Sequence, residues 1–206
     1  MISRAQGKTL AADVAVRKQP KLSGLEKAML KWAVVDPEDK LLDANIGAGM
    51  MAEYLRRNMQ CEVCGISDNM EDVRRSRSRL QNCDIVYAAP GDIPWREGAF
   101  DTVLIKYSGE ERAVQQRSFA EASRVLKAGG QLILGAVCYP AAVNALAGMF
   151  ADGGAEERCP FKRDEMADLL AACGFEKITW QRTGFGTGVM IAWKKKPEVD
   201  ELRCAG

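Results

Sequence analysis

The residues best suited to bind a charged ligand lie where a short apolar run ends at Asp43 and is followed by Gly47 and Gly49. The pattern predicts a strand, a glycine-containing turn and then a helix. Glycine permits positive φ and lets a ligand approach the main chain, and the N–H groups and positive dipole end of the following helix point back at the turn. Such a unit favours an anionic or nucleotide-like ligand. The dinucleotide fingerprint is incomplete, because Ala52 stands where its third glycine would fall.

The 206-residue chain contains no histidine. This excludes a Ser-His-Asp triad, a Cys-His dyad and a His-ligated metal. Any general base must be a carboxylate, Lys, Tyr, Cys, water or the substrate itself. Cys61 and Cys64 have the spacing of a zinc or redox pair. On a strand, however, their side chains would face opposite sides, and no second pair completes a tetrahedral site. We therefore expect no bound metal.

Apolar runs alternate with amphipathic segments, which indicates a doubly wound, Rossmann-like α/β fold with helices on both faces of a mostly parallel, seven-stranded sheet. The expected strands cover residues 40–44, 61–66, 84–88, 100–106, 131–137, 175–182 and 188–194. The expected helices cover residues 22–35, 48–59, 70–80, 111–126, 141–150 and 163–173, with Ser23 and Asn69 as caps. The last two strands are too close in sequence for a helical crossover and must form an antiparallel hairpin. Ligands of such folds bind beyond the carboxyl ends of the strands.

The length fits a single domain over residues 1–206, with a core over about 40–194 and a charged, frayed tail over 195–206. The net charge of +1 gives no overall field that would favour nucleic acid or an anionic membrane. No window approaches the ~18 consecutive apolar residues of a membrane span, and the first residues lack the apolar stretch of a secretory signal. We expect a cytoplasmic protein with reduced cysteines and with no nucleic-acid or membrane partner.

Four segments resemble motifs of the class I S-adenosylmethionine-dependent methyltransferases. Residues 41–49 resemble their first glycine motif, 93–103 their Leu-Pro-Phe…Ser-Phe-Asp-Val-Val segment, 124–132 their Arg-Val-Leu-Lys-Pro-Gly-Gly turn, and 171–175 the Glu-Ala-Gly-Phe before their last strands. The segments follow the family's order and spacing, and the small ubiquinone-biosynthesis-type members resemble the chain most. The resemblance implies S-adenosylmethionine as cofactor. Its sulfonium is an activated donor, so the protein mainly aligns the reactants.

Three positions depart from the family pattern. Asn45 stands in place of the first turn glycine, and Asn is the non-glycine residue that best tolerates left-handed φ. Ser67 stands where the family has a carboxylate for the ribose hydroxyls. Asp68 follows one residue later, where strand alternation would turn its side chain to the other face. Ala89 stands where an acidic residue would bind the adenine amino group, and Asp92 lies three residues beyond it.

The resemblance implies a cofactor shell of Asp43, Asn45, Gly47, Gly49, Ser67, Asp92 and Ile93. It places Lys106 and Tyr107 on the substrate side, Tyr107 as a base or orienting group and Lys106 as a contact for an acidic substrate, with Tyr139 as a weaker candidate. The leading hypothesis is methyl transfer to a small-molecule acceptor. The alternative is a non-catalytic methyltransferase-like module that binds a partner protein or another nucleotide, because all three departures face the cofactor.

Overall fold

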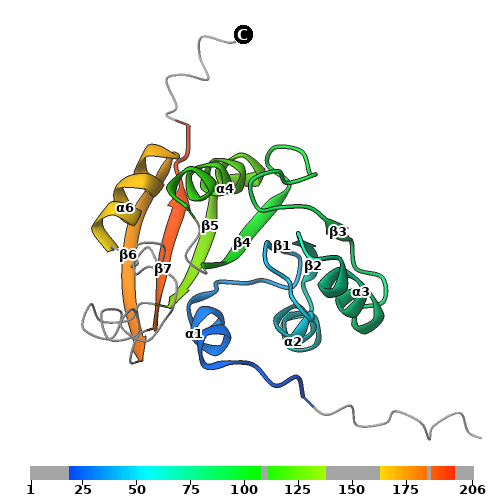
Figure 1. Cartoon of the computed structure of the whole chain (residues 1–206). Helices are drawn as coiled ribbons and strands as arrows, with labels where there is room; N and C mark the ends of the chain where they lie inside the picture. The colour runs from blue at the N-terminus through cyan, green and yellow to red at the C-terminus, as the bar shows by residue number, and fades with distance from the viewer. Residues whose placement is uncertain (1–18, 108–110, 138–162, 185–186, 198–206) are drawn as a thin grey trace, which may run out of the picture.

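The computed structural model describes residues 19–107, 111–137, 163–184 and 187–197. These residues form a seven-stranded sheet of order β3-β2-β1-β4-β5-β7-β6 with helices on both faces (Figure 1). The strands are β1 (Lys40–Asp43), β2 (Glu62–Ser67), β3 (Ile85–Tyr87), β4 (Phe100–Tyr107), β5 (Leu126–Val137), β6 (Phe175–Gly184) and β7 (Thr187–Lys194). The helices are α1 (Gly24–Trp32), α2 (Met50–Asn58), α3 (Met70–Arg79), α4 (Arg112–Val125) and α6 (Arg163–Ala172). The expected doubly wound architecture is confirmed, while the helix expected over 141–150 lies outside the described residues.

The strand β1 lies at the centre of the parallel part of the sheet. It pairs in parallel with β2 and β4, so that Asp43 lies opposite Gly65 and Leu104. The pairs β2–β3 and β4–β5 are also parallel, which brings the carboxyl ends of β1 to β4 to one edge. The strand β7 runs antiparallel between β5 and β6, as the hairpin prediction requires. The strand β5 begins earlier than expected, because Leu126 already pairs with Phe100 before the register shifts.

Side-chain caps fix where two of the helices begin. Ser23 Oγ accepts the Glu26 N–H at 3.2 Å, and Glu26 Oε2 accepts the Ser23 N–H at 2.8 Å, which together form a capping box. Asn69 Oδ1 accepts the Glu71 N–H at 2.9 Å at the start of α3. Both caps agree with the sequence-based expectation, and the first places Glu26 in the opening turn of α1.

The sheet is buried on both faces, as parallel sheets usually are. The side chains of Leu41 and Leu104 pack with residues of α1, α2 and α3 on one face. Their neighbours Leu42 and Ile105 pack with residues of α4 and α6 on the other. This alternation follows from the two-residue period of a strand. It assigns a face to each residue at the carboxyl edge, where the chain leaves β1 and β4 (Figure 1).

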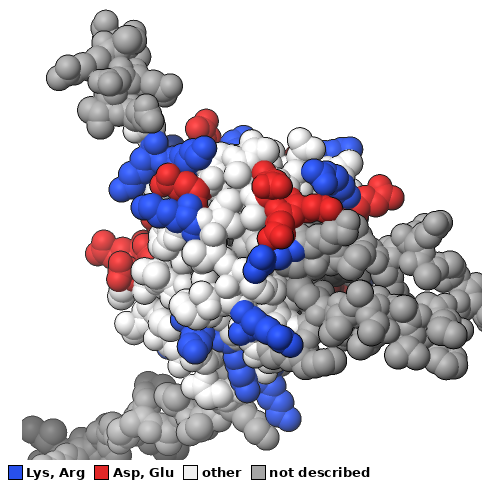
Figure 2. Space-filling model, turned by 90° about the vertical axis from the view of Figure 1, so that its left-hand side faces the viewer, with Lys and Arg blue, Asp and Glu red and all other residues white. Residues whose placement is uncertain are grey.

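The surface carries charges of both signs. Figure 2 shows the side of the molecule with β6 and α6, where acidic and basic side chains mix over the upper part and Lys and Arg lie below a mostly uncharged band. This mixture agrees with the net charge of +1. Within the described ranges, none of the helices combines the length and the apolar character that a bilayer crossing requires.

Candidate functional site

The turn after β1 uses its two glycines in different ways. Gly47 has φ +53° and Gly49 has φ +77°. A Cβ at Gly47 would meet no atom within 4 Å, whereas a Cβ at Gly49 would lie 2.9 Å from Leu80 Cδ1 and 3.2 Å from Ser76 Cβ. Gly49 also occupies the N-cap position of α2. Gly47 therefore presents bare backbone to open space, and Gly49 lets α3 pack closely against the turn.

Asp43 is fully buried at the end of β1. Its Oδ1 accepts the Asn45 N–H at 3.2 Å and lies 4.0 Å from Lys106 Nζ. Its Oδ2 accepts no hydrogen bond from the part of the chain that the structure describes. Burial raises the pKa of this carboxyl above its ordinary value, although the Lys106 ammonium and the Asn45 hydrogen bond oppose the rise. An unpaired, buried carboxylate oxygen is costly, so Asp43 has capacity for a donor group of a ligand.

Asn45 does not adopt the left-handed conformation that would explain it as a substitute for glycine. The described non-glycine residues with positive φ are Gln60, Asn82 and Lys177. The expectation that Asn45 tolerates left-handed φ therefore gives the wrong reason for its presence. Its side chain forms a bridge instead, because Oδ1 accepts the backbone N–H of Lys106 at 2.9 Å. Glycine could not make this bond, which ties the turn after β1 to the end of β4.

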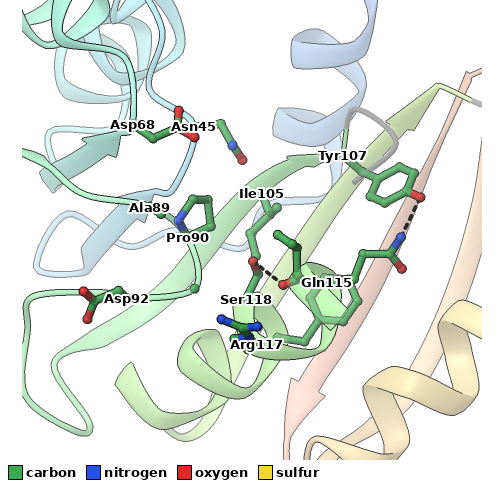
Figure 3. A pocket seen from close by; sticks show the side chains of 13 residues that line it. Asn45, Asp68, Ala89, Pro90, Asp92, Ile105, Tyr107, Gln115, Arg117 and Ser118 are labelled. Carbon is green, nitrogen blue, oxygen red and sulfur yellow. Dashed lines mark hydrogen bonds between the residues drawn. The ribbon is translucent and has the colours of Figure 1, made fainter. Parts of the chain in front are cut away.

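A cavity of about 400 Å³ lies beyond the carboxyl ends of the parallel strands, on the face covered by α4 (Figure 3). Its volume lies within the range of small-molecule sites, and its position is the one expected for a ligand in a doubly wound sheet. The lining comes from the segments after β1, β2 and β3, from the end of β4 and from α4: Asn45, Asp68, residues 89–92, Ile105, Tyr107, Val114, Gln115 and residues 117–119.

The carboxylate at the end of β2 that lines this cavity belongs to Asp68. Ser67 is 7% exposed, and its Oγ accepts the Asn69 N–H at 3.1 Å. Strand alternation does not extend to Asp68, because β2 ends at Ser67 and the chain turns at once into the cap of α3. In Figure 3, Asn45 and Asp68 lie together at one side of the cavity. The carboxylate that the alternation argument set aside is thus the one that faces the candidate site.

The loop after β3 contributes residues 89–92 to the lining, including Asp92. Ile93 is buried in the core on the α4 face and is not among the lining residues. Two residues of α4 hold its backbone: Glu121 Oε2 accepts the Ile93 N–H at 2.9 Å, and Arg124 donates to the Ile93 carbonyl at 2.8 Å. The hydrogen bond from Arg124 lowers the pKa of Glu121. Ile93 therefore anchors the loop, and Asp92 is the member of the expected pair that reaches the cavity.

Lys106 and Tyr107 are neighbours in sequence but serve different parts of the site. Tyr107 lines the cavity, and its hydroxyl accepts a hydrogen bond from Gln115 Nε2 at 2.9 Å (Figure 3). The Lys106 ammonium lies instead toward α1, 3.7 Å from Glu26 Oε1 and 4.0 Å from Asp43 Oδ1. Tyr107 remains a candidate for the substrate side. The third residue expected there, Tyr139, lies outside the described residues.

Sequence reasoning missed Glu26, Gln115 and Arg117 as members of this region. The capping-box pattern places Glu26 at a helix start, but nothing in it indicates a contact with a residue of β4. The α4 residues fall within the expected helix over 111–126, although the sequence does not show which part of that helix meets the strand ends. The positions of all three are set by tertiary packing.

The two cysteines of the C-x-x-C segment face opposite sides of the sheet, as expected. Cys61 is buried in the cluster that includes α1, α2 and α3, and Cys64 in the cluster that includes α4 and α6. Burial raises the pKa of the Cys64 thiol to about 12, which keeps it a protonated and poor metal ligand near neutral pH. Across the described ranges, no three or more Cys, Asp or Glu side chains gather as a metal site would need.

Comparison with known proteins identifies the family. Residues 42–134 match the family model described as a methyltransferase domain. Over 196 residues, the chain is 28% identical to the demethylmenaquinone methyltransferase of Tropheryma whipplei, an alignment that covers 84% of this chain and 81% of that relative. The chain belongs to the class I S-adenosylmethionine-dependent methyltransferase family.

Two further comparisons bear on this methyltransferase-family chain. It is 30% identical over 130 residues to the sarcosine/dimethylglycine N-methyltransferase of Halorhodospira halochloris, which covers 59% of this chain and 44% of the relative, so the chain spans less than half of that protein. Among solved structures, a chain in the complex of the Haloferax volcanii Trm112 methyltransferase activator with a putative methyltransferase superposes with TM-score 0.71 at 14% identity. That match covers 84% of this chain and 89% of the other, and it shows a shared fold.

Proposed function

We propose that this protein binds S-adenosylmethionine across the carboxyl ends of β1, β2 and β4 and transfers its methyl group to a small-molecule acceptor. The observation that carries the proposal is the cavity of about 400 Å³ at this edge, next to a turn in which Gly47 leaves the backbone uncovered. Family membership implies this cofactor. The chemical features of the site agree with a nucleoside that carries a cationic amino-acid tail.

Each part of such a ligand has a plausible partner in the chain. Asp43 Oδ2 is a buried acceptor for the ammonium of the tail, and no described group occupies it. Asp68 supplies a carboxylate to the cavity for hydroxyl donors of a ribose. The loop of residues 89–92 and Ile105 provide the apolar and backbone surface against which a flat base packs. The role that the sequence gave to Ser67 passes, in this proposal, to Asp68.

Methyl transfer asks little acid–base chemistry of the protein. The cofactor, when bound, supplies a methyl group that is already activated by its sulfonium. The chain's residues hold and align the acceptor and exclude water from the cavity. Tyr107 is the side chain best placed to orient a nucleophile or take its proton, because its hydroxyl lies in the cavity wall. Lys106 is proposed for a different role below, because its ammonium points toward α1.

A small acceptor is supported by the size of the cavity and by the relatives. The demethylmenaquinone and sarcosine/dimethylglycine methyltransferases carry small molecules in their names. A volume of about 400 Å³ suits small ligands. The identity of the acceptor is a matter for assay.

Two measurements in sequence test the proposal. Calorimetry with S-adenosylmethionine and S-adenosylhomocysteine should give one-to-one binding with a Kd of micromolar order, about −8 kcal/mol. Methyl-labelled S-adenosylmethionine should then transfer label to members of a panel of quinols, amines and thiols. Absence of binding to either ligand by the folded protein would reject the proposal and favour a non-catalytic module. Binding without transfer to any acceptor class would reject the small-molecule acceptor but leave the cofactor site in place.

A further inference from the structure

The ammonium of Lys106 lies between two carboxylates without a short bond to either. It is 3.7 Å from Glu26 Oε1 and 4.0 Å from Asp43 Oδ1. Direct charge-assisted hydrogen bonds between such groups are about 2.7–2.9 Å long. The side chain of Asp43 is fully buried, that of Glu26 is 15% exposed and that of Lys106 is 24% exposed. The lysine therefore balances the charge of this acidic pair, Glu26 and Asp43, while remaining within reach of solvent.

Three elements bring these groups together. Asp43 ends β1 and lies opposite Leu104 of β4, and Lys106 follows two residues later on the same face. Glu26 comes from the first turn of α1, where the capping box uses its Oε2 and leaves Oε1 directed at Lys106. Asn45 fixes the backbone of Lys106 by accepting its N–H. The backbone of Lys106 is thus held, while its four-carbon side chain keeps its rotational freedom.

The acidic pair adjoins the cavity at the edge of the sheet. The cavity lies on the α4 face, and the pair lies on the face toward α1. Asn45 belongs to both, because it lines the cavity and bonds to the backbone of Asp43 and Lys106. A ligand that extends from the cavity over the ends of β1 and β4 therefore reaches Asp43 at its far end. Within the described residues, Asp43 Oδ2 still accepts no hydrogen bond.

We propose that Lys106 is an internal occupant of the acidic pair, which the primary ammonium of a ligand's amino-acid tail displaces, so that Lys106 selects against ligands that carry such a tail. This inference rests on the proposed function, since S-adenosylmethionine and S-adenosylhomocysteine carry that ammonium. Two ammonium groups within about 4 Å of the same carboxylates repel each other. Binding of the tail therefore requires Lys106 to turn out into solvent and give up its attraction to Glu26 and Asp43.

Replacement of the lysine charge tests the inference through binding alone. Lys106→Gln should bind S-adenosylhomocysteine more tightly than the parent, by about tenfold, a coupling typical of interacting sites. The affinity for 5′-methylthioadenosine, which has the nucleoside and the sulfur but no ammonium, should stay unchanged. Lys106→Arg keeps the charge and should leave both affinities near parental values. Lys40→Gln is the matched control, because Lys40 pairs with Glu62 at the other end of β1 and should change neither affinity.

The two ligands separate failure of this inference from failure of the proposed function. If the parent binds both ligands and Lys106→Gln binds S-adenosylhomocysteine equally or less well, the inference is wrong. Weaker binding would mean that Lys106 contacts the carboxylate of the tail. Methylthioadenosine binding by the variant reports that its cavity is folded, so a loss of both ligands in Lys106→Gln alone would also overturn the inference and assign Lys106 a structural role. If neither the parent nor any variant binds either ligand, the proposed function and the inference fall together.

Discussion

Asn45 Oδ1 accepts the backbone N–H of Lys106 at 2.9 Å, while the Asn45 N–H donates to Asp43 Oδ1 at 3.2 Å. One residue thus links the end of β1 to the end of β4 with both its backbone and its side chain. The link lies between the cavity and the acidic pair of Glu26 and Asp43. The residue at position 45 therefore controls how far apart the two strand ends lie, in a family whose pattern has glycine there.

Loss of this side-chain bond should destabilise the protein. Asn45→Ala removes the acceptor and leaves the Lys106 N–H to find water, so we expect the free energy of unfolding to fall by about 1–2 kcal/mol. Asn45→Gly should lose about 0.5–1 kcal/mol more, because glycine adds freedom to the unfolded chain. Urea denaturation of the three proteins measures both steps. An Asn45→Ala variant as stable as the parent would show that the Asn45–Lys106 bond contributes nothing to stability.

The sequence predicts the fold well because each element carries a strong local signal. The caps at Ser23 and Asn69 occur as expected, and strong apolar runs predict the strands. The early start of β5 was missed, because Gly129 and Gly130 read as a turn while the pairing of Leu126 with Phe100 extends the strand through them. Pairing between distant strands outweighs local preference at that point.

The site is predicted less completely because it depends on where elements end and how they meet. A motif places Asp43 and Gly47 correctly at the carboxyl edge. The alternation rule fails at Asp68, since the strand ends one residue before it. The contact between Glu26 and Lys106 joins residues eighty positions apart, and only the packing of α1 on the sheet brings them together. No local pattern carries that information.

The two turn glycines should respond differently to a methyl group. Gly47→Ala should cost about 1 kcal/mol of stability from its φ of +53° and should greatly weaken S-adenosylhomocysteine binding, because the Cβ projects into otherwise open space. Gly49→Ala should destabilise more, since its Cβ would lie 2.9 Å from Leu80 Cδ1 in addition to its strain at φ +77°. Thermal melting and calorimetry on both variants give the comparison. Parental binding by Gly47→Ala would place the ligand away from this turn.

Asp68 and Ser67 should separate binding from stability. Asp68→Asn should weaken binding of S-adenosylhomocysteine by about tenfold, because the carboxylate lining the cavity is lost as an acceptor for hydroxyl donors. Ser67→Ala should leave affinity near the parental value and cost about 0.5–1.5 kcal/mol of stability, since its Oγ accepts the Asn69 N–H. Calorimetry and urea denaturation measure the two effects. The reverse pattern would return the ribose contact to Ser67.

Tyr107→Phe tests the substrate side of the cavity. The variant keeps the ring and removes the hydroxyl that accepts from Gln115 Nε2. With an acceptor identified, we expect kcat to fall while the Kd for S-adenosylhomocysteine stays within about twofold, since the hydroxyl acts on the acceptor. The pH dependence of kcat in the parent should follow the acceptor or Tyr107, because the chain contains no imidazole. Turnover at the parental rate would remove Tyr107 from the mechanism.

Asp43 should reduce stability while supporting binding. Burial raises its pKa in the folded protein above the ordinary value of 3.8, so the folded state holds this proton more tightly than the unfolded chain does. The resulting stabilisation is complete below the unfolded pKa and is lost as pH rises through the folded pKa, which leaves ionised Asp43 a net cost at higher pH. Asp43→Asn removes that charge and retains an oxygen that can accept the Asn45 N–H.

The variant should therefore unfold at pH 7 with a free energy equal to or above that of the parent, and the difference should shrink as the pH falls toward 4. Its affinity for S-adenosylhomocysteine should fall by about tenfold or more, because the ligand's ammonium loses a charged acceptor. Urea denaturation at several pH values and calorimetry at pH 7 measure these effects. Asp101→Asn is the control, since Asp101 pairs with Lys127 at 2.8 Å away from the site and its loss should bring no gain in stability and no change in binding. An Asp43→Asn variant that is less stable than Asp101→Asn at pH 7 would show that the buried carboxylate is satisfied without a ligand.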